Sequence, residues 1–387
     1  MTYYLPQIKT ALLFFPFIAL LITLPYMIIQ YHKYGSVLIY KTIVFYSFML
    51  YLLCCYFLVI MPLPSFAAVE NSAAIQPQLI PFTFISDFIR DSQFNINDFS
   101  TYLPAFRSFP FLTIFFNVML FMPFGIYLRY YFKLKWHQVL LISFLLSLFF
   151  ELTQLTGLYG IYPKAYRIFD VDDLITNTAG GMLGYFITPL FSFFLPERKT
   201  VDNWAYQKGV NVSFTRRFIA WLIDLTILFS LMIGLNLSGF SKVLPLGLPI
   251  ILIDYLISVL LLFILIPLLR KGQTIGKWIV KIRLADLNKQ VLKPWLMITR
   301  FSLIYLIIFP APLWSIWCLT LMQDNRLIIN LIFIALFFGF LGIAIIFPIH
   351  TFLMLFHKEK YLLYDRFLHI EHVSTIDYRP KENDSAK

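Results

Sequence analysis

The feature that most constrains this chain is a series of apolar runs, each close to 20 residues long. A helix of about 20 residues, rising about 1.5 Å per residue, crosses the roughly 30 Å of hydrocarbon in a bilayer. Since 60% of the 387 residues are hydrophobic and 13% are charged, an ordinary soluble domain is excluded. The sequence predicts an all-α, polytopic integral membrane protein with about nine transmembrane helices in two bundles. The expected spans are residues 11–30, 41–63, 110–131, 138–157, 174–194, 217–236, 248–269, 298–320 and 327–349.

The net charge of +11 is concentrated in alternate connections between these spans. Basic residues gather at 129–135, 198–217 and 270–293, and the positive-inside rule therefore predicts that these three connections are cytoplasmic. The connection at 64–109 then lies outside, as does the N-terminus, and the C-terminus is cytoplasmic. Membrane topology thus accounts for the charge, so we expect membrane lipids as partners and no nucleic acid.

A shift to polar composition at residues 197–213 predicts a cytoplasmic linker between two membrane domains. Before it we expect two N-terminal helices in residues 1–63 and a domain at 64–196 that opens with the outer loop 64–109. After it we expect a second membrane domain at 214–372 and a polar tail at 373–387. The three cysteines lie in expected spans and lack metal-site spacing, so we predict neither a metal nor a cofactor.

Polar side chains in residues 110–191 are the strongest candidates for function. In hydrocarbon an unpaired charge near a helix centre costs roughly 2.5 to 3.5 kcal/mol on insertion scales, so its presence needs a partner or a purpose. The predicted topology brings these side chains to one depth beneath the outer surface. They are Asn117, Glu151, Gln154, Arg167, Asp170, Asp173 and Asn177.

Helical spacing predicts how these residues meet. Glu151 and Gln154 share one face of their helix, and Asn177 lies on a stripe with Gly180 and Gly184. The two glycines form a GxxxG pair, which we expect to bring the Glu151 helix against the Asn177 helix, so that the amide satisfies the carboxylate. Arg167 is the expected cationic partner of Glu151.

Structural roles are the alternatives for several of these residues. Asn117 and Asn177 could simply join helices by hydrogen bonds. Asp170 and Asp173 could cap the helix that begins beside them, because acidic groups favour a helix N-terminus. Glu151 is harder to explain structurally, since a carboxylate in hydrocarbon must be protonated or paired.

The order of these motifs resembles the VanZ-like family of membrane proteins over about residues 40–195. The matching segments are LIPF at 79–82, NVMLFMPFG from Asn117, ELTQ from Glu151 and RIFDVDDLITNTAGG from Arg167. The stretch GLYGIYPKAY before Arg167 is longer than the family's shortest version. The resemblance implies a bacterial plasma-membrane location and an association with resistance to teicoplanin and related lipoglycopeptides. A lipidated glycopeptide or a lipid-linked envelope precursor is the implied ligand.

The second half resembles the RDD family over about residues 214–372. The segments FTRRFIAWLIDLTIL, KGQTIGKWIVKIRLAD and KYLLYDRFLHIEHV carry the resemblance. The matching positions are Arg217, Asp224, Gly272, Gly276, Lys277 and Asp365. The family resemblance implies cation transport for some members. We expect Asp224 to pair with a basic group such as Arg300; an ion or proton pathway that includes Asp254 is the alternative. GQTIGK is too short for a phosphate-binding loop, so a tight turn at the inner surface is expected.

Three functions remain open. The first is a non-enzymatic protein whose polar pocket in the outer leaflet binds or excludes a lipid-linked or lipidated compound. The second is a cation or proton transporter through the RDD half. The third is a membrane enzyme acting on lipid-linked envelope precursors, with Glu151 or Asp173 as general base and Arg107 or Arg167 as an anion clamp. The sequence contains no recognisable nucleophile and base pair, so we assign no catalytic residue.

Overall fold

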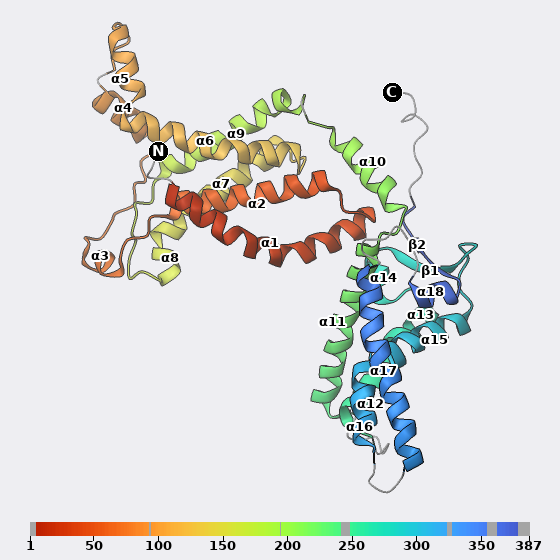
Figure 1. Ribbon diagram of the computed structural model, residues 1–387. Coiled ribbons are helices and arrows are strands. Elements are labelled where there is room, and N and C mark those ends of the chain that lie inside the picture. The colour runs from red at the N-terminus through yellow and green to blue at the C-terminus, as the bar shows by residue number, and fades with distance from the viewer. Residues whose placement is uncertain are drawn as a thin grey trace, which may run out of the picture. The chain divides into compact units, whose positions relative to one another are not determined.

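The computed structural model describes residues 5–92, 94–193, 195–240, 248–322, 327–353 and 362–377 (Figure 1). Most of the tail expected at 373–387 lies outside the described residues. The chain divides into two compact units. Unit 1 comprises residues 1–23 and 38–202, and unit 2 comprises residues 24–37 and 203–387. The division falls within the first helix, α1 (Leu5–Tyr34), and within α10 (Arg198–Gly209).

Unit 1 contains four long helices besides the first part of α1. They are α2 (Ile39–Ile60), α6 (Phe109–Tyr130), α7 (Trp136–Leu155) and α9 (Val171–Ser192). The connection between α2 and α6 holds short helices, namely α3 (Phe66–Asn71), α4 (Thr83–Ser92) and α5 (Tyr102–Phe106), with a 3₁₀ turn at Phe99–Thr101. Another short helix, α8 (Gly157–Gly160), follows α7.

Glycines bring α6 and α9 into backbone contact. A Cβ atom on Gly180 would lie 2.4 Å from the Val118 carbonyl oxygen, and one on Gly184 would lie 1.9 Å from that of Met122. The GxxxG pair therefore packs against α6, and the prediction that it packs against α7 is wrong. Gly181 is the residue that meets α7, because its Cβ would lie 2.2 Å from the Ser143 hydroxyl.

Unit 2 begins with the last part of α1 and α11 (Phe214–Ser238). A second long helix combines α12 (Ile250–Val259), a π-helical segment at Leu260–Leu265 and α13 (Ile266–Leu269). The short helix α14 (Ile275–Ile279) follows. Helix α15 (Pro294–Ser302) then continues as a π-helical segment at Leu303–Ile308. The remaining helices are α16 (Ala311–Thr320), α17 (Leu327–Leu353) and α18 (Leu363–Phe367). A core of aromatic and aliphatic side chains, including Leu228, Phe263, Phe301 and Tyr305, joins these helices.

Two short strands pair in unit 2, although the sequence analysis predicted none. Strand β1 (Ile282–Asp286) runs antiparallel to β2 (Ile370–Ser374), with Ile282 opposite Ser374 and Asp286 opposite Ile370. The pairing joins segments that are far apart in sequence. Both strands lie outside the long apolar helices, so the class of the fold remains all-α.

Among the described residues, seven helices are long and apolar enough to cross a membrane, or eight if α15 with its π-helical extension and α16 form one broken span. The predicted number of about nine is therefore approximate. The span expected at 298–320 is bent by 52° where Pro310 and Pro312 interrupt the helical hydrogen bonds. The span expected at 174–194 corresponds to α9, whose first turn is acidic and which is not one of these seven helices. The protein is a multi-pass integral membrane protein.

Candidate functional site

The polar cluster of unit 1 is organised by the start of α9. Asp170 is the N-cap residue, and its carboxylate accepts a hydrogen bond of 2.8 Å from the amide of Asp172. The positive end of the helix dipole also stabilises acidic residues at this position. Burial raises the pKa of Asp170 above its ordinary value, and the neighbouring carboxylates of Asp172 and Asp87 raise it further. The capping role considered for Asp170 is therefore present.

Glu151 contacts this same turn from α7. Its side chain is 2% exposed, and its Oε2 atom accepts a 3.0 Å hydrogen bond from the Asp170 amide. Arg167, the expected ion-pair partner, is exposed and donates through Nη1 to the carbonyl of Val59 at 2.6 Å. A backbone amide beside the positive end of a helix thus takes the place that we predicted for the guanidinium.

Two amide side chains link the helices of unit 1. Asn117 on α6 donates to Oδ1 of Asp173 at 2.6 Å. Asn177 on α9 donates to the Ser147 hydroxyl of α7 at 2.9 Å, and that hydroxyl donates to the Asp173 carbonyl at 3.3 Å. These bonds correspond to the interhelical alternative. The prediction that the Asn177 amide satisfies Glu151 is wrong, because Ser147 lies one helical turn closer along α7.

Gln154 and Arg167 attach the end of α2. Gln154 Nε2 donates to the Val59 carbonyl at 3.0 Å, so this one oxygen accepts bonds from both side chains. Tyr166 also donates, to the carbonyl of Ile60, at 3.3 Å. The polar groups of this region are thus partly used to bind backbone carbonyls that have no further helical partner.

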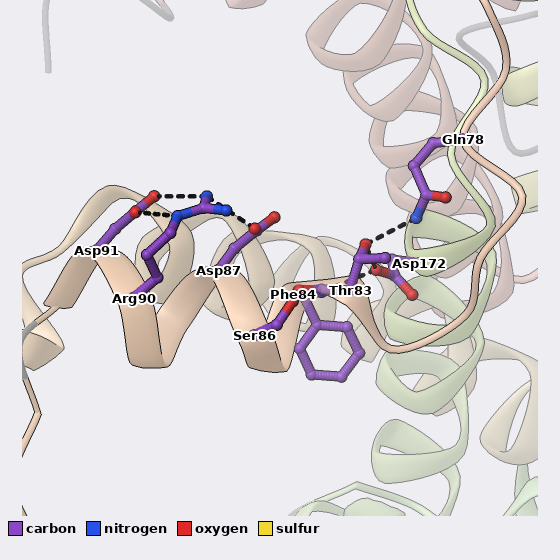
Figure 2. Close-up of polar contacts among 8 residues, drawn as sticks. All are labelled: Gln78, Thr83, Phe84, Ser86, Asp87, Arg90, Asp91 and Asp172. Atoms are coloured by element: carbon purple, nitrogen blue, oxygen red, sulfur yellow. Dashed lines mark hydrogen bonds and ion pairs between the residues drawn. The ribbon is translucent and has the colours of Figure 1, made fainter.

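Asp172 is a residue that the sequence analysis missed. It is 5% exposed, and its two oxygens accept bonds from the amides of Phe82 (2.6 Å) and Phe84 (2.9 Å) and from the Thr83 hydroxyl (2.5 Å). Figure 2 shows the carboxylate at the start of α4. Residues 78 and 169–171 pair alongside, with the amide of Gln78 donating to the Phe169 carbonyl at 2.8 Å. The LIPF segment (79–82) therefore contacts the DVDD segment (170–173). Both segments belong to the motifs that carry the family resemblance, and this shared membership was the signal in the sequence that could have predicted their contact.

Several acceptors in this cluster keep no donor from the described part of the chain. Glu151 Oε1 and Asp173 Oδ2 form no hydrogen bond with any described residue, and Asn177 Oδ1 is buried without one. Arg167 is the nearby cation, and it is exposed. Such an arrangement can accept hydrogen bonds from ammonium, hydroxyl or amide groups. No group of three or more His, Cys, Asp or Glu among the described residues could hold a metal ion.

A second buried polar cluster lies in unit 2. Asp224, 4% exposed on α11, accepts bonds from the Thr274 hydroxyl (2.5 Å) and the Gly276 amide (2.7 Å). Gly276 is required here, because a Cβ would lie 2.1 Å from the Ala220 carbonyl oxygen. The expected pairing of Asp224 with Arg300 is wrong, since the turn before α14 reaches this carboxylate with neutral donors.

Arg300 instead pairs with Asp365. Arg300 Nε lies 2.7 Å from Asp365 Oδ1, and His372 Nε2 lies 3.2 Å from Oδ2. Burial tends to raise the pKa of Asp365, but Arg300 and His372 outweigh it and hold this pKa well below its usual range. Burial lowers the pKa of His372 to about 3. Burial, with Arg300 nearby, lowers the pKa of Lys277 to about 8, and its ammonium lies 5.4 Å from the centre of the Phe301 ring.

Arg216 is another residue that the sequence analysis passed over. It is fully buried and donates to the carbonyls of Gly209 (2.8 Å), Val280 (2.7 Å) and Lys281 (2.6 Å). Its neighbour Arg217, the residue that we assigned to the RDD motif from sequence, lies 5.6 Å from the centre of the Phe214 ring. Gly272 adopts a φ of +90°, as a tight turn requires.

Comparison with known families gives two adjacent matches. The VanZ/LLP1 family model matches residues 48–192, and the RDD family model matches residues 212–369. Neither the curated proteins nor the solved structures include a match to this chain.

Proposed function

Because the chain carries a VanZ/LLP1 domain followed by an RDD domain, we propose that it contributes to teicoplanin and lipoglycopeptide resistance, or more broadly to homeostasis of the cell envelope. The polar cluster of unit 1 is the proposed site. It binds the polar part of a lipidated glycopeptide or a lipid-linked envelope precursor at the outer leaflet of the bacterial plasma membrane. In the proposed membrane orientation, which puts the polar cluster near the outer leaflet, the N-terminus lies outside the cell and the C-terminus lies in the cytoplasm.

The surplus of hydrogen-bond acceptors around Glu151 is the observation that carries this proposal. Glu151 is almost fully buried in an apolar helix, yet one of its two oxygens has no donor from the described chain. Asn177 Oδ1 is buried without a partner, and Oδ2 of the partly buried Asp173 has no donor from the described chain. A lipoglycopeptide offers matching groups, since its sugar hydroxyls and amines are donors and its acyl chain favours the bilayer. Aromatic and aliphatic side chains of the surrounding helices would contact that acyl chain.

Drug susceptibility tests the proposal directly. Cells expressing the wild type, Glu151→Gln or Glu70→Gln at equal membrane levels would be compared for growth in teicoplanin and in vancomycin. Glu70 is an exposed residue of α3, outside the polar cluster, so it controls for loss of a carboxylate as such. We expect Glu151→Gln alone to lose protection against teicoplanin. Equal protection from all three proteins removes the cluster from the proposal, and no protection by the wild type removes resistance itself.

Cation or proton transport through unit 2 is a second candidate. Two carboxylates are buried within its spans, since Asp224 is 4% exposed and Asp254 is 1% exposed. Carboxylates inside spans occur in ion and proton pathways. Flux in proteoliposomes that is abolished by Asp224→Asn but retained in Glu151→Gln would favour transport over the lead proposal.

A further inference from the structure

Helix α4 carries its charged side chains on one side and large apolar side chains on the other. On one side Arg90 bonds to Asp87 at 2.8 Å and to Asp91 at 2.7 Å, and Figure 2 shows these three residues along a single side of the helix. Ile85 and Ile89 lie on the opposite side, one turn apart, and are 48% and 60% exposed. A short helix of this kind, with charge on one face and large apolar side chains on the other, is typical of helices that lie in a membrane interface.

The position of α4 in unit 1 places it at a membrane boundary. Phe88 contacts the ring of Phe111 in the first turn of α6, with 6.2 Å between ring centres. The 22 residues of α6 rise about 33 Å, which is enough to cross the hydrocarbon, so its first turn lies close to the headgroups. In Figure 1 the α4–α5 hairpin turns away from the axis of α6 at this end.

The rest of the hairpin also exposes large apolar side chains, which lie among polar ones. Phe99 is 83% exposed and Leu103 is 60% exposed, and both lie between α4 and the start of α6. Exposed apolar side chains that gather in one segment mark a surface that binds a protein partner, a ligand or a membrane. Here the segment runs directly into a membrane span, so the lipid of the same leaflet is the occupant that the structure favours.

We propose that the α4–α5 hairpin is an interfacial membrane-binding element. Ile85 and Ile89 lie at the boundary between headgroups and acyl chains, while Asp87, Arg90 and Asp91 face water. Arg90 is paired with both Asp87 and Asp91, so one positive charge faces two negative ones and this face has no excess of positive charge to attract anionic headgroups. The element therefore binds lipid through apolar burial and does not need anionic headgroups. This inference concerns lipid alone and is independent of any drug or envelope precursor.

Spin labels on the two faces of α4 test this inference in the bilayer. Cys54, Cys55 and Cys318 would be replaced by alanine, a single cysteine would be introduced, and the labelled protein would be placed in phosphatidylcholine vesicles. The four labelled positions are Ile85, Ser86, Ile89 and Arg90. Oxygen, which concentrates in acyl chains, and a water-soluble nickel chelate would be compared as relaxants. We expect oxygen to dominate at 85 and 89 and nickel to dominate at 86 and 90.

Three results would overturn the proposal. Nickel access at all four positions means that α4 lies in water, and protection of 85 and 89 from both relaxants means that protein covers this face, as in contact with a second copy. Adding phosphatidylglycerol should leave the pattern unchanged; a pattern that appears only with this anionic lipid contradicts apolar binding.

A second test keeps the native cysteines. In vesicles, the double substitution Ile85→Asp and Ile89→Asp should speed amide hydrogen exchange within α4 at least about tenfold, because charged side chains cannot remain in the boundary layer. The matched substitution of Ser86 by Asp, on the water-facing side, should leave the exchange rate within about twofold. Equal rates in the wild type and the double variant would contradict lipid binding by this face.

Discussion

Asp172 should determine whether α4 stays attached to the start of α9. Its carboxylate accepts three hydrogen bonds, from Phe82, Thr83 and Phe84, and each is worth about 1 kcal/mol after exchange with water. Phe82 has a φ of 65°, a left-handed conformation that costs a non-glycine residue about 1 kcal/mol. About 2 kcal/mol therefore remains to favour attachment.

Asp172→Ala removes the three bonds but not the Phe82 conformation, so the opening equilibrium of α4 should shift by about 3 kcal/mol, or roughly 150-fold. Asp172→Ala should accelerate amide exchange in residues 83–92 by about this factor when measured by mass spectrometry in detergent micelles. Asp87→Ala is the control, because Asp87 is part of an exposed ion pair with Arg90, and such pairs contribute little. Unchanged exchange in Asp172→Ala, or equal acceleration in Asp87→Ala, would refute this reasoning.

Three further predictions concern packing and charge. Gly184→Ala should lower the melting temperature in detergent markedly and Gly234→Ala should not, because an added Cβ meets backbone at 1.9 Å in the first case and nothing within 4 Å in the second. Arg300→Met leaves Asp365 buried without its cation and should lower the free energy of unfolding in chemical denaturation by about 3 to 5 kcal/mol, and an unchanged free energy would contradict this. Acidification should destabilise unit 2, because His372 binds a proton near pH 6.5 in the unfolded chain but only near pH 3 in the folded one. The pKa of Asp365 is also lower in the folded protein than in the unfolded chain. The free energy of unfolding should therefore fall by about 1.4 kcal/mol per pH unit for each group, below pH 6.5 for His372 and below about pH 4 for Asp365. His372→Gln should flatten the upper part of this profile, and an unchanged profile would contradict the assignment.

The long helices could be predicted from sequence because length and apolar composition suffice to identify a span. The two family matches also follow motifs that are visible in the sequence. The strands β1 and β2 could not be predicted from sequence, because each has only five residues and the two strands are more than 80 residues apart.

Hydrogen-bond partners were the least predictable feature. Glu151 bonds to the amide of Asp170, and Gln154 and Arg167 bond to the carbonyl of Val59. Backbone groups occur at every residue and have no signature in the sequence, so reasoning from side chains favoured an Arg167 ion pair. Asp224 shows the same effect, because its partners include the Gly276 amide. Sequence analysis thus located the polar residues, while the fold determined which backbone groups reached them.

Glu151→Leu separates a binding role from a structural one. A buried carboxylate with one hydrogen bond from the described chain carries a large desolvation cost, whereas leucine of similar volume would lose that single bond and avoid the cost. The net change in folding free energy should therefore be neutral or favourable, by up to about 2 kcal/mol.

If the carboxylate serves a ligand, Glu151→Leu should raise or preserve the melting temperature and abolish protection against teicoplanin. Stabilisation with loss of activity is the pattern expected of binding residues that are poorly satisfied by their own fold. A variant that unfolds would instead mean that Glu151 serves to hold the Asp170 turn against α7, and a stable variant that protects as well as the wild type would mean that Glu151 does not bind the ligand.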